Sequence, residues 1–133
     1  MIRELNLDKV LAIRQRVMYP LQTVEEMRLP ADDEGWHLAY WVDNKPVSVI
    51  SVFRKSDEWQ FRKFATETEF QGQGYGTQLL SYVMEAAEQA GVKRIWCNAR
   101  LSATALYKRM GMEEAGESWT KNNIDFIIME RKF

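Results

Sequence analysis

Three glycines at alternate positions, Gly72, Gly74 and Gly76, separate a segment with strand periodicity from one with helical periodicity. Residues 59–65 alternate as a strand does, whereas apolar side chains between residues 79 and 90 recur at helical spacing. Glycine permits backbone conformations with positive φ and lets main-chain N–H groups approach a ligand closely. A helix start adds unpaired N–H donors and the positive end of the helix dipole. The junction therefore suits a phosphate, although three glycines also suffice for a purely structural turn.

The spacing of the glycines separates three known kinds of phosphate-binding loop. The dinucleotide pattern GxGxxG fails because its third glycine position is Thr77, and because no carboxylate stands at the end of the following strand pattern. A P-loop fails as well, since Gly76 is followed by Thr and Gln instead of Lys and Ser or Thr. The pattern QxxGxG remains, filled by Gln71, Gly74 and Gly76.

The rest of the chain reads as short alternating elements. A helix is expected over residues 7–18, after the N-cap residue Asn6 and before Pro20. The stretch 21–35 is expected to form a helical turn and a surface loop that walls a substrate cleft. Further helices are expected over 79–90 and 103–110, and strands over 37–42, 46–53, 59–65, 94–98, 112–116 and 124–130, with a short first strand within 1–5. The strand, helix and strand across 59–98 predict one parallel pairing in a mostly antiparallel sheet.

Composition limits what such a chain does. Its 133 residues, 46% of them hydrophobic, suit one domain spanning 1–133. A net charge of -1 provides no global field that would attract nucleic acid or an anionic membrane. No apolar run approaches the roughly 18 residues that span a bilayer, and the N-terminus lacks a secretory signal, so we expect a cytoplasmic location. One Cys and one His exclude an ordinary zinc site, and we expect no metal.

Three segments resemble motifs of the GNAT superfamily of N-acyltransferases. They are FRKFATETEFQGQGYG around the glycine loop, the strand WCN at residues 96–98, and ALYKRMGM at residues 105–112. The resemblance is strongest from Trp59 to Met112, and the other expected strands are consistent with it. It implies a single-domain α/β (α+β) fold. The implied sheet is mixed and mostly antiparallel, with six or seven strands splayed between the fourth and fifth, and about four helices flank it.

The resemblance also implies a reaction and a set of site residues. Acetyl-CoA would donate its acyl group to a primary amine of a small molecule or peptide by direct attack. The implied cofactor-binding residues are Phe64, Ala65, Thr66, Gln71, Gly72, Gln73, Gly74, Tyr75, Gly76, Thr77, Asn98 and Tyr107. Backbone N–H groups near the first three would stabilise the oxyanion, and Asn98 would bind the pantetheine arm. Tyr107, with an ordinary pKa of about 10, would protonate the leaving thiolate, whose thiol has a pKa of about 8.5.

A base that deprotonates the acceptor ammonium is less well defined. The candidates are His37, Glu25, Glu26, Glu67 and Glu69. We choose Glu67 as the predicted base because it lies near the thioester-binding strand, and a water relay is the alternative. Cys97, the only cysteine of the sequence, is expected to be a buried side chain and not a nucleophile.

Two other functions stay open at this point. One is a catalytically silent CoA-binding module, and the other is an interaction domain whose glycines are only structural. The sequence leaves open the acceptor, the acyl group and the oligomeric state, for which a homodimer is one option.

Overall fold

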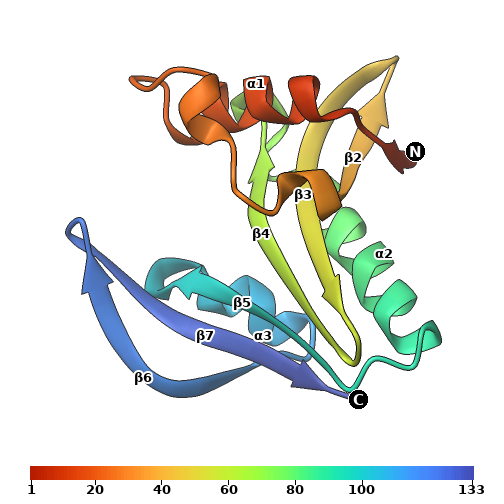
Figure 1. The fold of residues 1–133 in the computed structure, drawn as a ribbon, viewed down its shortest axis with the longest axis vertical. Coiled ribbons are helices and arrows are strands. Elements are labelled where there is room, and N and C mark those ends of the chain that lie inside the picture. Colours follow the sequence, from red (N-terminus) through yellow and green to blue (C-terminus); the bar gives the residue numbers. More distant parts are fainter.

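The computed structural model describes residues 1–133 and contains one sheet of seven strands, in the order β1-β2-β3-β4-β5-β7-β6 (Figure 1). The strands are β1 (Ile2–Glu4), β2 (Trp36–Val42), β3 (Lys45–Lys55), β4 (Glu58–Thr66), β5 (Arg94–Arg100), β6 (Glu113–Lys121) and β7 (Ile124–Lys132). Only β4 and β5 run parallel, and every other neighbouring pair is antiparallel. The predicted mixed sheet with a single parallel pairing is confirmed.

Three α-helices flank the sheet, one fewer than expected. They are α1 (Leu7–Met18), α2 (Tyr75–Gln89) and α3 (Thr104–Arg109). Residues 21–35 form only the 3₁₀ turns η1 (Glu25–Met27) and η2 (Asp32–Glu34), because the prolines at 20 and 30 interrupt the helical hydrogen bonding there. Two more such turns are η3 (Thr68–Phe70) and η4 (Leu101–Ala103). No helix combines the length and apolar character needed to cross a membrane.

The helices cover opposite faces of the sheet. α1 lies in front of the sheet and α3 behind it (Figure 1). The larger core has 18 buried residues and includes the apolar face of α2 together with Tyr107 of α3. A smaller core of six residues packs Val10 and Ile13 of α1 against Val49 and Ala65 of the sheet. We call these two sides the α2 face and the α1 face.

A bulge in β4 changes which of its side chains share a face. Simple alternation places Phe61 with Ala65 and puts Phe64 on the other side, and this expectation is wrong. Lys63 and Phe64 together lie opposite the single residue Ile50, and Lys63 has a φ of 54°. Because the extra residue shifts the alternation, Phe61 and Phe64 both face α2, with ring centroids 6.4 Å apart. Ala65 joins the core under α1 instead.

The strands β4 and β5 part after a short paired stretch. Three residue pairs join them, ending at Gln60 and Trp96, although β4 continues to Thr66 and β5 to Arg100. The two strands form the arms of a V in Figure 1. At the closed end, Arg94 donates to Glu58 at 2.7 Å and to Glu130 of β7 at 2.6 Å. The predicted splay between the fourth and fifth strands is confirmed.

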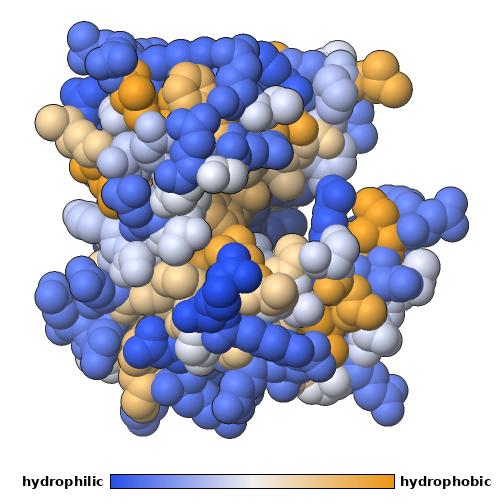
Figure 2. All heavy atoms as spheres, turned by 180° about the vertical axis from the view of Figure 1, so that it is seen from behind, coloured by the Kyte–Doolittle hydropathy of each residue, from blue (hydrophilic) through white to orange (hydrophobic).

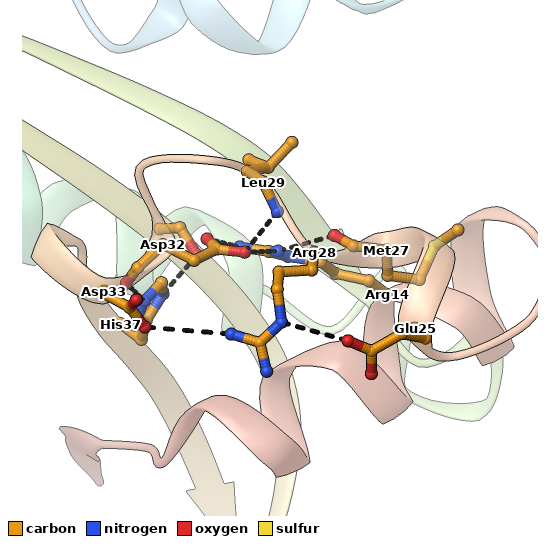
Figure 3. Close-up of polar contacts among 9 residues, drawn as sticks. Arg14, Glu25, Met27, Arg28, Leu29, Asp32, Asp33 and His37 are labelled. Atoms are coloured by element: carbon orange, nitrogen blue, oxygen red, sulfur yellow. Dashed lines mark hydrogen bonds and ion pairs between the residues drawn. The ribbon is translucent and has the colours of Figure 1, made fainter.

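A buried polar network fixes the loop between α1 and β2 (Figure 3). Arg14 of α1 donates to both carboxylate oxygens of Asp32, at 2.8 and 2.9 Å. It also donates to the Met27 carbonyl at 3.0 Å and to Ser51 Oγ of β3 at 2.8 Å. The two ring nitrogens of His37 contact Ser51 Oγ at 2.7 Å and the Asp32 carbonyl at 2.8 Å. One fully buried guanidinium therefore connects the helix, the loop and the sheet.

The carboxyl of Asp32 has a lowered pKa. Burial raises this pKa, but the hydrogen bonds from Arg14 and the Leu29 N–H, with the charge of Arg14, outweigh that effect. Because the folded pKa lies below the unfolded value of about 3.9, the ionised carboxylate stabilises the fold above that pH. This contribution is lost as the pH falls through the folded pKa.

We expect Asp32→Asn to lower the free energy of unfolding by about 3–5 kcal/mol at pH 7, because it leaves a buried guanidinium without its counter-charge. Urea titration measures this value. The neighbouring Asp33 provides the control, because its side chain is exposed and its ion pair with Arg28 is long, at 3.8 Å. Asp33→Asn should cost less than about 0.5 kcal/mol. Equal losses for the two variants would contradict a role for the buried pair.

Candidate active site

The open end of the V between β4 and β5 holds a cleft of about 590 Å³. Its lining comes from β4, β5, η4, α3, the hairpin of β6 and β7, and the end of α1 with the segment after it. Figure 2 shows the surface hollowed between an upper and a lower part, where hydrophobic and hydrophilic residues meet. Unpaired strand edges therefore face each other across a space large enough for an extended ligand.

The cleft passes through the sheet from one face to the other. On β5, Cys97 and Ala99 belong to the core on the α2 face, so the alternate residues Asn98 and Arg100 lie on the α1 face. All four line the cleft. The α2 side of the cleft is mostly apolar and includes Tyr107. The α1 side places Arg100 and Asn98 beside the stacked rings of Trp119 and Phe126.

The glycine loop forms the start of α2. Gly72 and Gly74 have φ values of 75° and 88°, which are strained for any other residue, and the space where their side chains would stand is open. Helical hydrogen bonding begins with the Gln78 N–H donating to the Gly74 carbonyl at 3.0 Å, and no side chain caps the helix. The preceding N–H groups, up to that of Thr77, are thus available to an anion.

Packing and glutamine side chains hold the loop against the end of β4. A Cβ atom at Gly76 would stand 3.1 Å from Thr66 Oγ1 and 3.2 Å from Phe64 Cζ, so a glycine allows this close approach. Gln71 Nε2 donates to the Thr66 carbonyl at 3.0 Å. Gln73 Nε2 likewise donates to the carbonyl of Glu69, at 3.2 Å. Both glutamines brace the backbone of the loop.

Tyr107 is buried, with its ring centroid 5.8 Å from that of Phe61, and it lines the cleft. Burial raises the pKa of its phenol well above the usual value, and the nearby Cys97 adds to the effect. Its hydroxyl therefore keeps its proton throughout the physiological range. No hydrogen bond within the chain engages that hydroxyl.

The structure brings some of the predicted cofactor residues into the cleft and leaves others outside it. Phe64, Asn98 and Tyr107 line it. Ala65 is buried under α1, and the Thr66 hydroxyl contacts Ser48 Oγ at 2.9 Å. The remaining predicted residues, Gln71, Gly72, Gln73, Gly74, Tyr75, Gly76 and Thr77, form the loop and the first turn of α2.

None of the five candidate bases lines the cleft. Arg16 binds the carboxylate of Glu67 with contacts of 2.6 to 3.2 Å, and this pair lines a separate small hollow that also includes Glu69. His37 belongs to the buried network. Glu25 pairs with Arg28, and Glu26 accepts a hydrogen bond from the Thr23 N–H. The choice of Glu67 stays a prediction.

Three charged cleft residues were missed by sequence reasoning: Arg62, Lys63 and Arg100. Two of them could have been found from the sequence, since Arg62 and Arg100 lie two positions along the same strand from the predicted site residues Phe64 and Asn98. In the chain as a whole, no three His, Cys, Asp or Glu side chains gather where they would hold a metal ion.

A family model described as an acetyltransferase (GNAT) domain matches residues 5–133. The chain belongs to the GNAT family. It is 24% identical over 125 residues to the uncharacterized N-acetyltransferase YitI of Bacillus subtilis, covering 87% of this chain and 84% of YitI. A shorter segment of 62 residues is 36% identical to the ribosomal protein bS18 alanine N-acetyltransferase of Escherichia coli K12, covering 44% of this GNAT protein and 42% of that enzyme.

Solved structures share the fold. The Escherichia coli ribosomal-protein-S18-alanine N-acetyltransferase superposes with a TM-score of 0.81 at 22% identity, over 99% of this chain and 92% of the other. A GNAT family acetyltransferase from Elizabethkingia anophelis, solved with acetyl-CoA bound, gives a TM-score of 0.73 at 17% identity, over 100% and 97% of the two chains. These likenesses establish the splayed GNAT sheet as the architecture of this chain.

We expect the thiol of Cys97 to be inert in the folded protein. Burial raises its pKa to about 12, so almost no thiolate exists at pH 8. Labelling with a disulfide reagent at pH 8 should be at least about a hundredfold slower in buffer than in denaturing urea. Equal rates in the two solutions would show that the thiol is accessible and ionisable.

Proposed function

We propose that this GNAT protein transfers the acetyl group of acetyl-CoA to a primary amine. The observation that carries the proposal is the position of the glycine loop, which packs directly on the end of β4 beside a cleft that runs through the sheet. A phosphate-binding helix start and a slot for a narrow extended chain are thus adjacent. The acetyl-CoA found in the Elizabethkingia relative supports the same use here.

The loop would hold the pyrophosphate through backbone donors and the helix dipole. The loop itself contains no Lys or Arg, so main-chain N–H groups from Gly72 to Thr77 would supply most of the stabilisation. Bracing by Gln71 and Gln73 keeps these groups oriented before binding. The pantetheine arm would then follow the unpaired edge of β4, with Asn98 across the cleft as a hydrogen-bond partner.

Acetyl-CoA supplies a thioester whose carbonyl carbon accepts the lone pair of the amine and whose sulfur departs with the electrons of the carbon–sulfur bond. Backbone N–H groups of β4 near Phe64, free of a β5 partner, would stabilise the developing oxyanion in this narrow slot. Tyr107 would donate its proton to the departing sulfur and recover one, through solvent, from the acylated nitrogen. Its raised pKa keeps the donating form present at physiological pH.

The acceptor must lose a proton before it attacks, since an ammonium has no lone pair. Glu67 stays the predicted base. Its carboxylate lies outside the cleft and is bound by Arg16, which favours a relay through water over direct contact with the amine. The predicted cytoplasmic location and the option of a homodimer likewise stay predictions.

The loop assignment is tested with two glycines of matched strain. Gly74→Ala and Gly116→Ala both place a Cβ atom at positive φ in open space, and Gly116 lies on β6. Each should cost about 1–2 kcal/mol of stability. Only Gly74→Ala should weaken CoA binding, by about tenfold, because it moves N–H donors away from the pyrophosphate. Calorimetric titration with CoA measures the Kd of both variants. Equal weakening of CoA binding in the two would refute the assignment.

The role of the phenol is tested by Tyr107→Phe. This variant should lower kcat by about a hundredfold while the Kd for acetyl-CoA stays unchanged, because only the proton donor is removed. Thiol release from acetyl-CoA, with the amines described below as acceptors, measures the rate. The control is Tyr82→Phe, which removes an exposed hydroxyl from α2. An unaltered kcat in Tyr107→Phe would show that another group protonates the thiolate, whereas thiol release from neither protein would favour a catalytically silent CoA-binding module.

A further inference from the structure

The charged residues that line the cleft all carry a positive charge. They are Arg62, Lys63, Arg100 and Lys121, and no Asp or Glu accompanies them. The chain as a whole has 19 acidic and 18 basic residues, so an even mixture of charges would be the ordinary outcome. Gathering one sign of charge in a concave, low-dielectric site raises the local potential and concentrates counter-ions there.

These four cations also lack acidic partners. None has a carboxylate within the 4.0 Å of an ion pair, whereas Arg14, Arg16 and Arg94 all do. The nearest polar contact of Lys63 Nζ is the hydroxyl of Tyr19, at 3.4 Å. Arg62, Arg100 and Lys121 are exposed, and their side chains make no hydrogen bond within the chain. Their donors are available to a ligand.

The positive residues on β4 and β5 lie on the face away from the glycine loop. Arg62 pairs with Ser51, whose hydroxyl contacts Arg14 of α1, so both side chains are on the α1 face. Lys63 reaches Tyr19, which directly follows α1. Arg100 lies on the same face, since Ala99 points into the α2 core. The loop and α2 are on the other side, so these cations are separated by the sheet from the pyrophosphate site.

We propose that the acceptor is a primary amine that also carries an anionic group, a carboxylate or a phosphate, and that Arg62 and Arg100 bind this group. The proposal rests on the proposed acetyl transfer and names the substrate class of that site. Guanidinium groups match carboxylate and phosphate oxygens with two parallel hydrogen bonds. A cofactor arm that enters from the α2 face leaves the α1 face to the acceptor.

The same charges act on the amine itself. Like charge nearby disfavours the protonated form of an amine, so the cleft lowers the pKa of the bound acceptor and raises the share of free base. This fits a cleft that contains no carboxylate base. A polyamine, whose several positive charges find no counter-charge here, is selected against by the same field.

Matched amines test the proposal. Thiol release from acetyl-CoA is measured with L-alanine against L-alaninamide, and with phosphoethanolamine against ethanolamine, with spermidine as a polycation. We expect kcat/KM to be at least about tenfold higher for an anionic member than for its neutral partner, and lowest for spermidine. The alanine and ethanolamine pairs distinguish a carboxylate from a phosphate. Preference for the neutral amines or for spermidine overturns the proposal and leaves acetyl transfer intact.

Single charge removals identify the residues. Arg62→Gln and Arg100→Gln should each reduce the anion preference by about tenfold, through KM of the acceptor, while KM for acetyl-CoA stays unchanged. Lys55→Gln, which removes an exposed charge at the far end of β3, should leave the preference unchanged. A rise in KM for acetyl-CoA, with unaltered acceptor preference, would assign these arginines to the cofactor and overturn the proposal.

A binding measurement separates failure of this inference from failure of the proposed function. Calorimetry with N-acetyl-L-alanine, N-acetyl-L-alaninamide and N-acetylphosphoethanolamine requires no turnover. Binding of an anionic compound but not of the amide, lost in Arg62→Gln, supports the anion site even when no amine is acetylated, in which case acetyl transfer alone fails. No difference among the three compounds overturns the anion site.

Discussion

The short parallel pairing between β4 and β5 is the constraint on which the rest of the structure depends. Three residue pairs and the two ion pairs of Arg94 close one end of the V, while the other end lacks the hydrogen bonds that would close it. Unpaired backbone inside a protein is costly unless a ligand or water satisfies it. The bulge at Lys63 adds to the separation by bending β4 and redirecting Phe64 toward α2. A through-sheet cleft is the outcome.

Helices and turns whose ends carry a capping, proline or turn-forming residue were predicted correctly from the sequence. The helix expected over residues 7–18 coincides with α1, because Asn6 caps it and Pro20 stops its continuation. The strands expected over 37–42 and 46–53 also form, and the tight turn between them has Asp43 and Asn44 at positive φ. In contrast, the strand expected to end at Gly116 continues to Lys121, since pairing with β7 resumes beyond an irregularity there. Long-range pairing overrode a residue that usually marks a turn.

The candidate site divides in the same way. The glycine loop, Asn98 and Tyr107 belong to recognisable local patterns, and the structure brings them to one cleft or its rim. The bulge at Lys63 could not be predicted from the sequence, because a lysine rarely has a positive φ and no neighbouring residue type indicates an extra residue in the strand. The sequence also does not indicate that Arg62, Arg100 and Lys121 line one cleft, because they come from three different strands. Their proximity results from the splay and from the β6–β7 hairpin.

The burial of Cys97 has a consequence for an enzyme that handles activated acyl groups. This thiol lines the same cleft in which a thioester would lie, and transfer between two sulfurs is nearly isoenergetic. Only a thiolate attacks, and a pKa of about 12 leaves almost none at neutral pH. With acetyl-CoA bound as proposed, the chain would thereby avoid acetylating itself at this cysteine.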